Sequence, residues 1–218
     1  MLQGKRLSIL GDSISTYRGI SNDADANATL FYNPVYYRPP FPAERTYWGL
    51  LMSALGLTLC VNNSWSGGNL SGRDNPDAGV NRATQLSRDD GTSPDLILVF
   101  MGTNDLGRRV DPAVFAADYR ETLARIRQKH PHAAICCVNL PDREPCVKAR
   151  AEVFNGHIQD AVAETGDGCF VADLFHSPLN NENYYNNTLD GLHPDEDGMR
   201  MIAQVVEAAI RKHYGEEA

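Results

Sequence analysis

The alternation of short apolar runs with longer segments of helical periodicity constrains the fold of this chain most. Runs of β-forming residues predict five strands, at 6–10, 58–62, 95–101, 133–139 and 169–174. Helices are expected between them, at 46–55, 78–87, 112–130, 144–164 and 194–213. Strands and helices that alternate in this way build a parallel sheet with helices on both faces. The sequence therefore predicts an α/β fold.

Length and charge exclude several classes of protein. A chain of 218 residues with no repeat, low-complexity tract or long linker has room for one domain, at 1–218. Its formal net charge of −8 gives no general attraction to nucleic-acid phosphates or anionic membranes. No stretch approaches the roughly 18 apolar residues of a membrane span, and the first residues do not resemble a signal peptide. We therefore expect a soluble cytoplasmic protein, or a secreted one if a leader has been trimmed.

Three long segments fall outside the regular alternation, at 17–45, 64–75 and 176–192. Each follows the carboxyl end of a predicted strand, which is the edge where open α/β sheets bind ligands. The first and last are rich in Tyr and Asn. Loops of this length in a compact domain usually form lids or walls of a functional site, so we expect them to surround one.

A candidate nucleophile lies directly after the first strand. The strand runs into Gly11-Asp12-Ser13, which places a serine hydroxyl at a tight turn. Such a hydroxyl becomes nucleophilic only with a base in hydrogen-bond reach and donors aimed at the developing oxyanion. The tripeptide alone arises by chance in about 3% of chains of this length, so its partners decide its meaning.

Two histidines are candidates for the base. His176 and His193 each have an aspartate three residues before them, Asp173 and Asp190, and such an aspartate can fix the imidazole tautomer. The spacing does not choose between the pairs, but Gly191 and the following helix start favour His193. The remaining histidines lie within or at the ends of predicted helices, or near the C-terminus: His130, His132, His157 and His213.

Candidate oxyanion donors follow the second and third strands. The sequence NNSWSGG at 62–68 ends in Gly67 and Gly68, whose backbone N–H groups can approach a substrate closely. The sequence GTND at 102–105 brings the side-chain amide of Asn104 to a strand end. A tight turn and a helix cap, respectively, are the structural alternatives for these segments.

These four segments together resemble the SGNH/GDSL hydrolase family. The blocks 11–15, 62–67, 102–105 and 190–194 occur in the order that the family shows, and GTND alone arises by chance in about 0.1% of such chains. The resemblance implies a three-layer α/β/α sandwich around a five-stranded, mostly parallel sheet of flavodoxin-like topology. It also implies a serine hydrolase that needs no cofactor.

Carried over position by position, the resemblance assigns the catalytic roles. Ser13 is the implied nucleophile, His193 the general base and then acid, and Asp190 the residue that orients it. The backbone N–H groups of Ser13 and Gly67 and the side chain of Asn104 form the implied oxyanion hole.

One position of the second block departs from the family. The family often has a glycine two residues before the Ser-Gly pair, where this chain has Ser64. The choice between Gly67 and Gly68 as donor therefore stays open at this stage.

Substrate is the least determined property. We expect Asp12, Trp65, Tyr184 and Tyr185 to contact it, and the Tyr- and Asn-rich loops favour a short acyl ester, such as O-acetyl, on a carbohydrate. A lysophospholipase or thioesterase, and an inactive binding protein on the same scaffold, remain alternatives. The aromatic segment 17–48 leaves room for a homo-oligomer.

We expect no metal. The five cysteines lack C-x-x-C spacing, which argues against a disulfide framework or a zinc site. The acidic runs 89–90 and 195–197 suit solvated charges and a helix start. Three arginines in the loops would either meet a substrate carboxylate or face water: Arg73, Arg108 and Arg109.

Overall fold

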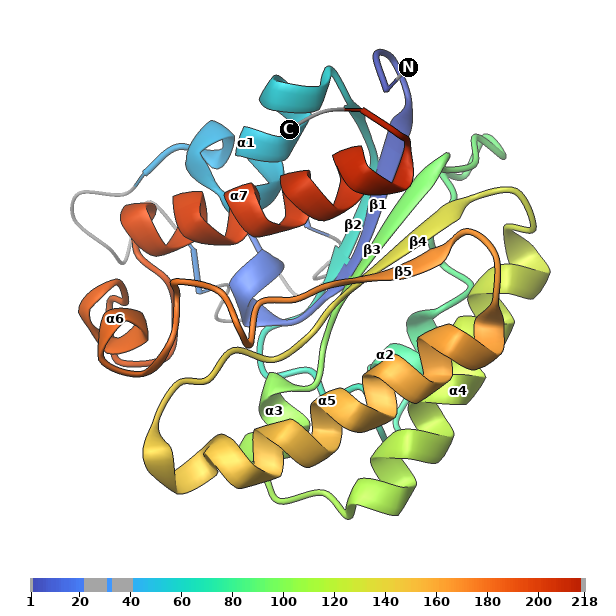
Figure 1. Cartoon of the computed structure of the whole chain (residues 1–218). Helices are drawn as coiled ribbons and strands as arrows, with labels where there is room; N and C mark the ends of the chain where they lie inside the picture. Colours follow the sequence, from blue (N-terminus) through green and yellow to red (C-terminus); the bar gives the residue numbers. More distant parts are fainter. Residues whose placement is uncertain (1, 22–30, 33–40, 217–218) are drawn as a thin grey trace.

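A sheet of five parallel strands runs through the centre of the computed structural model, which describes residues 2–21, 31–32 and 41–216 (Figure 1). The strand order is β2-β1-β3-β4-β5. The strands are β1 (Arg6–Gly11), β2 (Thr58–Ser64), β3 (Leu96–Phe100), β4 (Ala134–Val138) and β5 (Cys169–Ala172). Each strand begins within one residue of the start that the sequence predicts. The predicted parallel arrangement is confirmed.

The register places the ends of the central strands side by side. Gly11, the last residue of β1, pairs with Ser64 on β2 and with Phe100 on β3. Because all strands are parallel, the segments that follow them leave the sheet at the same edge. The motifs after these three strands are therefore brought together by the sheet itself.

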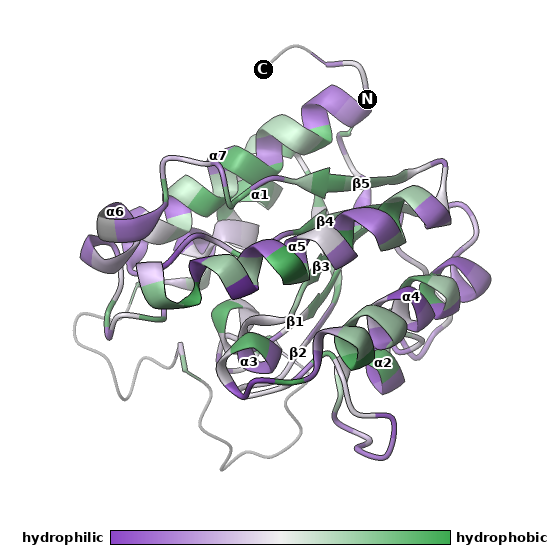
Figure 2. Ribbon diagram, turned by 60° about the horizontal axis from the view of Figure 1, so that its bottom comes forward, coloured by the Kyte–Doolittle hydropathy of each residue, from purple (hydrophilic) through white to green (hydrophobic). Residues whose placement is uncertain are grey.

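Helices cover both faces of the sheet, so the predicted three-layer fold is confirmed (Figure 1). One layer contains α1 (Tyr47–Leu55) and α7 (Glu196–His213). The other contains α4 (Pro112–Lys129) and α5 (Pro145–Thr165), with the short α2 (Gly79–Arg82) and α3 (Thr103–Gly107) beside them. Two separate buried apolar clusters fill the spaces between the sheet and these layers. Each amphipathic helix thus turns its apolar side to the strands. In Figure 2, hydrophilic (purple) and hydrophobic (green) residues alternate along these helices.

The long helices begin where the sequence provides caps. Asp111 accepts a hydrogen bond from the backbone N–H of Ala113 at 2.7 Å, and Pro112 occupies the first turn of α4. Asp195 does the same for α7 through the N–H of Gly198 at 2.9 Å. This helix was expected from 194 but begins at Glu196, because Asp195 is its cap.

The helix predicted at 78–87 is wrong in length, since α2 ends at Arg82. The backbone carbonyl of Gln85 accepts a hydrogen bond from Asn63 Nδ2 at 3.1 Å, and the carbonyl of Leu86 accepts one from Ser8 Oγ at 2.8 Å. These contacts with β1 and β2 fix the chain in a non-helical path. The short elements α3, α6 (Asn181–Asn186), η1 (Ser13–Ser15) and η2 (Ala43–Arg45) were not predicted, because one or two turns give no readable periodicity.

The five cysteines are all free thiols. Three are buried and pack as small apolar side chains, at positions 60, 136 and 137. Among the helices of the described part of the chain, none combines the length and the apolar character that crossing a membrane requires.

Candidate active site at the carboxyl edge of the sheet

Ser13 lies in a rigid turn at the end of β1. Asp12 caps this turn by accepting a hydrogen bond from the N–H of Ile14 at 3.0 Å. The carbonyl of Ser15 accepts hydrogen bonds from Trp48 Nε1 at 3.1 Å and from Asn62 Nδ2 at 2.9 Å. The turn that presents the Ser13 hydroxyl is therefore held from both α1 and β2.

Glycine is the only residue type that fits at position 11, where β1 enters this turn. A Cβ atom at this position would lie 2.6 Å from the side-chain oxygens of Ser15 and Ser64, which is far inside contact distance. The glycine of the first motif thus serves close packing of the turn against β2.

The structure brings Ser13, His193 and Asp190 into one hydrogen-bonded row. Nε2 of His193 lies 2.8 Å from Oγ of Ser13, although the two residues are 180 positions apart. Nδ1 of His193 lies 2.9 Å from Oδ2 of Asp190. The other carboxylate oxygen of Asp190 accepts the backbone N–H groups of Leu192 at 3.0 Å and of His193 at 2.8 Å. A base and its orienting carboxylate are thus fixed within one short loop before α7.

The imidazole of His193 is shielded from water, with 12% of its side chain exposed. The ring of Phe31 stacks on it, with centroids 3.3 Å apart and planes inclined by 12°. The neighbouring Tyr32 donates its hydroxyl to the carbonyl of Pro194 at 2.8 Å, which fixes the start of the segment leading to α7. Neither aromatic residue was assigned to the site from the sequence, because only the fold shows which loop aromatic covers the histidine.

Burial sets the charge state of the base. It lowers the pKa of His193 below the ordinary 6.5, although the hydrogen bond and charge of Asp190 act in the opposite direction. Asp190 is partly desolvated, yet the hydrogen bonds from His193 and Leu192 lower the pKa of its carboxyl. At neutral pH the pair is thus a neutral imidazole beside a carboxylate, which is the state that can accept a proton from a serine.

We expect kcat/KM for a neutral ester to fall as the pH drops through the pKa of His193, because only the neutral imidazole accepts a proton. Since that pKa is lowered, the midpoint of the acid limb should lie below pH 6.5. A pH–rate profile with p-nitrophenyl acetate, from about pH 4 to pH 9, measures it. An acid limb centred above pH 6.5 would contradict this assignment.

The second Asp-x-x-His pair has the same local geometry but lacks a nucleophile. Nδ1 of His176 lies 2.7 Å from Oδ2 of Asp173, and the backbone N–H of His176 reaches Oδ1 at 3.3 Å. The His176 side chain is 71% exposed, and no hydroxyl of the described residues lies in hydrogen-bond contact with its Nε2. The position of Ser13 therefore selects His193.

Among the described residues, two backbone N–H groups at the site have no partner. Within residues 2–21, 31–32 and 41–216, the N–H groups of Ser13 and Gly67 make no hydrogen bond, whereas Gly68 N–H donates to the carbonyl of Trp65 at 3.0 Å. Gly67 adopts φ of +72°, which suits glycine. Of the two glycines left open by the sequence, Gly67 is the one whose donor is available.

The third motif fixes the loop that carries Gly67. Asn104 donates one amide hydrogen to the carbonyl of Gly68 at 3.0 Å, which leaves its second amide hydrogen available. The carboxylate of Asp105 accepts the N–H groups of Leu70 at 2.7 Å and Ser71 at 2.9 Å. The motif thus positions both its own amide and the neighbouring glycine.

A buried arginine connects the strand ends beneath the site. Arg82, only 1% exposed, donates to the carbonyls of Gly11 at 3.2 Å, Asn63 at 2.6 Å and Asp77 at 2.8 Å. Its guanidinium also lies 3.4 Å from the sulfur of Met101, just beyond β3. Sequence reasoning missed it, because an arginine in an amphipathic segment gives no signal that it points inward.

Similarity to known proteins identifies the family of this chain. The model of the GDSL-like Lipase/Acylhydrolase family matches residues 9–201. The chain belongs to this family. A search of curated protein sequences finds no match.

Solved structures share the fold. A protein described as a GDSL-like lipase from Bacteroides ovatus is 22% identical with a TM-score of 0.72, over 96% of this chain and 99% of that one. A family two carbohydrate esterase from Clostridium thermocellum, in complex with cellohexaose, is 17% identical with a TM-score of 0.72, over 99% of this chain and 66% of that one. A carbohydrate esterase family 2 enzyme from Corynascus thermopiles is 20% identical with a TM-score of 0.67, over 97% and 67%.

Two of the expected substrate contacts are placed differently in this GDSL-like protein. Tyr184 is 1% exposed and donates its hydroxyl to the carbonyl of Leu192 at 2.6 Å, so it supports the His193 loop from inside the core. Asp12 is also 1% exposed, and burial raises the pKa of its carboxyl to about 7. Both side chains point inward, which corrects the expectation that they face a ligand.

The other two expected contacts remain accessible. Tyr185 is 69% exposed. Trp65 is half-buried and donates its Nε1 to Asn63 at 3.2 Å, which fixes the ring beside the Gly67 loop. A substrate can therefore touch these two rings.

The charged residues singled out from the sequence mostly have structural partners. Arg73 pairs with Asp118 at 2.6 Å, and Arg108 donates to the carbonyl of Gly67 at 2.8 Å. Among the residues that the structure describes, no three His, Cys, Asp or Glu side chains are grouped so that they could hold a metal ion.

Proposed function

We propose that this protein is a serine esterase that hydrolyses carboxylic esters through an acyl-enzyme intermediate. The observation that carries the proposal is the 2.8 Å contact between Nε2 of His193 and Oγ of Ser13, with Asp190 bound to the opposite ring nitrogen. This arrangement of nucleophile, base and orienting carboxylate performs acyl transfer on several unrelated folds. Membership of an acylhydrolase family supports the same chemistry.

The reaction follows from the positions of these groups. Oγ of Ser13 attacks the ester carbonyl while Nε2 of His193 takes its proton. Asp190 stabilises the resulting imidazolium. The carbonyl oxygen becomes an oxyanion, which accepts hydrogen bonds from the N–H groups of Ser13 and Gly67 and from the Asn104 amide.

Collapse of the tetrahedral intermediate breaks the bond to the alcohol, and His193 returns its proton to the leaving oxygen. Water then attacks the acyl group on Ser13, with His193 again as the base. The acid leaves and the serine regains its proton.

We further propose that the substrate is a short acyl ester, such as an acetyl ester, on a carbohydrate. A pocket near the catalytic loop is lined by Asn181, Asn186, Tyr185, Arg143 and Glu144, whose polar groups suit sugar hydroxyls. Two family 2 carbohydrate esterases share the fold, and one of them was solved with a bound cello-oligosaccharide.

Hydrolysis of a p-nitrophenyl ester series, from acetate to palmitate, tests the acyl preference. We expect kcat/KM to be highest for acetate and to fall with chain length, and acetate release from acetylated xylo- and cello-oligosaccharides to exceed hydrolysis of lysophosphatidylcholine and palmitoyl-CoA. A maximum at long acyl chains would favour a lipase or thioesterase. Rates for every ester equal to those of the Ser13→Ala variant would indicate a binding protein instead.

A further inference from the structure

A pocket of about 440 Å³, lined by charged, amide and tyrosine side chains, opens between the segment before α5 and helix α6. Its lining residues come from these two elements: Arg143, Glu144, Asn181, Tyr185 and Asn186. The backbone N–H of Asn181 donates to the carbonyl of Asp142, which joins the two walls. The pocket is thus a built feature of the fold.

The pocket adjoins the catalytic loop. The ring of Tyr185 lies so close to Gly191 that a Cβ at this glycine would be 3.0 Å from its edge. Gly191 follows Asp190 directly and lies two residues before His193. The charge of Arg143 also reaches the catalytic imidazole, since it contributes to the lowered pKa of His193.

Arg143 is a half-buried residue. It makes no hydrogen bond or ion pair with any residue of the described ranges. The two nearest acidic residues in sequence have other partners, because Asp142 pairs with Lys148 at 2.6 Å and Glu144 accepts the thiol of Cys146 at 3.2 Å. A partly desolvated arginine without a partner is a ready site for an anion, and its planar fork matches a carboxylate.

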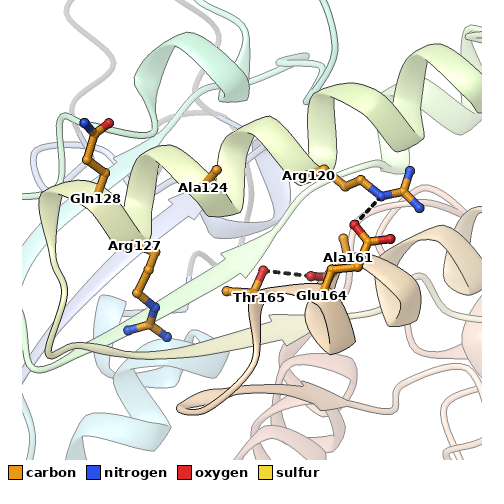
Figure 3. Close-up of a pocket in the computed structure, with 7 residues that line it drawn as sticks. All are labelled: Arg120, Ala124, Arg127, Gln128, Ala161, Glu164 and Thr165. Atoms are coloured by element: carbon orange, nitrogen blue, oxygen red, sulfur yellow. Dashed lines mark hydrogen bonds and ion pairs between the residues drawn. The ribbon is translucent and has the colours of Figure 1, made fainter.

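A second pocket, between α4 and α5, shows the contrast (Figure 3). There Arg120 pairs with Glu164 at 2.7 Å, and Arg127 donates to the carbonyls of Ala133 at 2.8 Å and Asp167 at 3.1 Å. The arginines of that pocket are occupied by the protein itself. The pocket of Arg143 differs, because its guanidinium has no hydrogen-bond or ion-pair partner among the residues that the structure describes.

The position of the pocket indicates which part of an ester it meets. His193 returns its proton to the leaving alcohol, so the alcohol must lie on the His193 side of the reacting carbonyl. The oxyanion donors Gly67 and Asn104 follow β2 and β3, the strands on either side of β1, whereas the pocket of Arg143 adjoins the loop that carries His193. A group in contact with Arg143 therefore belongs to the alcohol.

We propose that Arg143 and its pocket bind a carboxylate carried by the leaving alcohol, as in an acetylated acidic sugar. This inference rests on the proposed esterase function and specifies its substrate. The amides of Asn181 and Asn186 and the ring of Tyr185 complete the pocket around the sugar. The positive end of α5, which begins two residues after Arg143, adds to the attraction.

Two matched pairs of esters test this proposal: 3- and 4-acetoxybenzoate, each compared with its neutral methyl ester. The acetyl group and the position of the leaving oxygen are the same within a pair. The ratio of kcat/KM for the carboxylate to kcat/KM for its methyl ester therefore reports recognition of the carboxylate. We expect Arg143→Gln to lower this ratio by about tenfold or more for at least one pair, and Arg143→Lys to lower it less. The ratio cancels any change in the basicity of His193 that both substrates share.

Arg120→Gln is the matched control, because it removes an arginine that lines the second pocket, between α4 and α5, and not the pocket of Arg143. Its ratio should equal that of the wild type. Esterase activity on both members of each pair with a ratio insensitive to Arg143→Gln would overturn the carboxylate pocket and leave the esterase standing. Absence of all ester hydrolysis in the wild type would overturn the esterase itself. A wild-type preference for 4-acetoxyphenyl phosphate over both acetoxybenzoates would overturn the assignment to a carboxylate.

Discussion

Replacing Ser13 with alanine is expected to lower kcat for p-nitrophenyl acetate by about 10⁴- to 10⁶-fold, and His193→Ala should lower it to a similar level. The two groups act as a unit, because Oγ of Ser13 is nucleophilic only while Nε2 of His193, 2.8 Å away, takes its proton. The double variant should therefore be hardly worse than either single one. Initial rates with the purified variants, normalised to active wild-type enzyme, measure the effect.

His176→Ala is the matched control for this experiment. It removes an imidazole with the same bond to an aspartate three residues earlier, but one that is 71% exposed and away from Ser13. We expect its activity to stay within about twofold of the wild type. If His176→Ala lost activity while His193→Ala retained it, His176, paired with Asp173, would be the base instead. Thermal unfolding of all variants separates loss of chemistry from loss of fold.

Arg82→Met is expected to lower the free energy of unfolding by about 3–5 kcal/mol. Methionine retains an apolar stem of similar length but donates no hydrogen bond. The carbonyls of Gly11, Asn63 and Asp77 would then be left in the interior without the donors that satisfy them now. Urea denaturation followed by tryptophan fluorescence measures the loss, since the Trp65 ring lies beside Arg82 and Trp48 of α1 donates to the turn after β1.

Arg120→Met provides the comparison for this stability measurement. Arg120 pairs with Glu164 on the surface, with 39% of its side chain exposed, and such ion pairs contribute about 0–1 kcal/mol. Its variant should therefore unfold close to the wild type. Equal destabilisation by the two substitutions would show that Arg82 does not hold the strand ends together. Arg82→Lys, which keeps the charge but cannot reach all three carbonyls, should lie between the wild type and Arg82→Met.

The sheet and the main helices could be predicted from the sequence, because their signals are local. These signals are read from residues that are close together in the chain. They include the apolar runs of the strands, Pro112 after Asp111 at the start of α4, and the acidic residues that begin α7. The end of α2 could not be predicted in this way. It depends on hydrogen bonds from Asn63 and Ser8, which belong to strands that no pattern within the helix reveals.

The candidate site shows the same division. The motifs name Ser13, Asn104 and two Asp-x-x-His pairs, but only the folded chain shows which histidine meets the serine. Tyr184 and Tyr185 are adjacent and chemically identical, yet one is buried and the other exposed, because α6 turns them to opposite sides. Arg143 could not be singled out from the sequence, because only the fold determines which residues lie near an arginine.

The order of the catalytic groups along the chain links chemistry to the completion of folding. Ser13 lies in the turn after the first strand, whereas His193 lies in the loop before α7, 180 residues later. During synthesis the Ser13 turn is made long before its base, and the growing chain cannot attack an ester until α7 docks beside α1. Esterase activity would thus report the attachment of α7, which makes a chromogenic ester a convenient probe for this step of refolding.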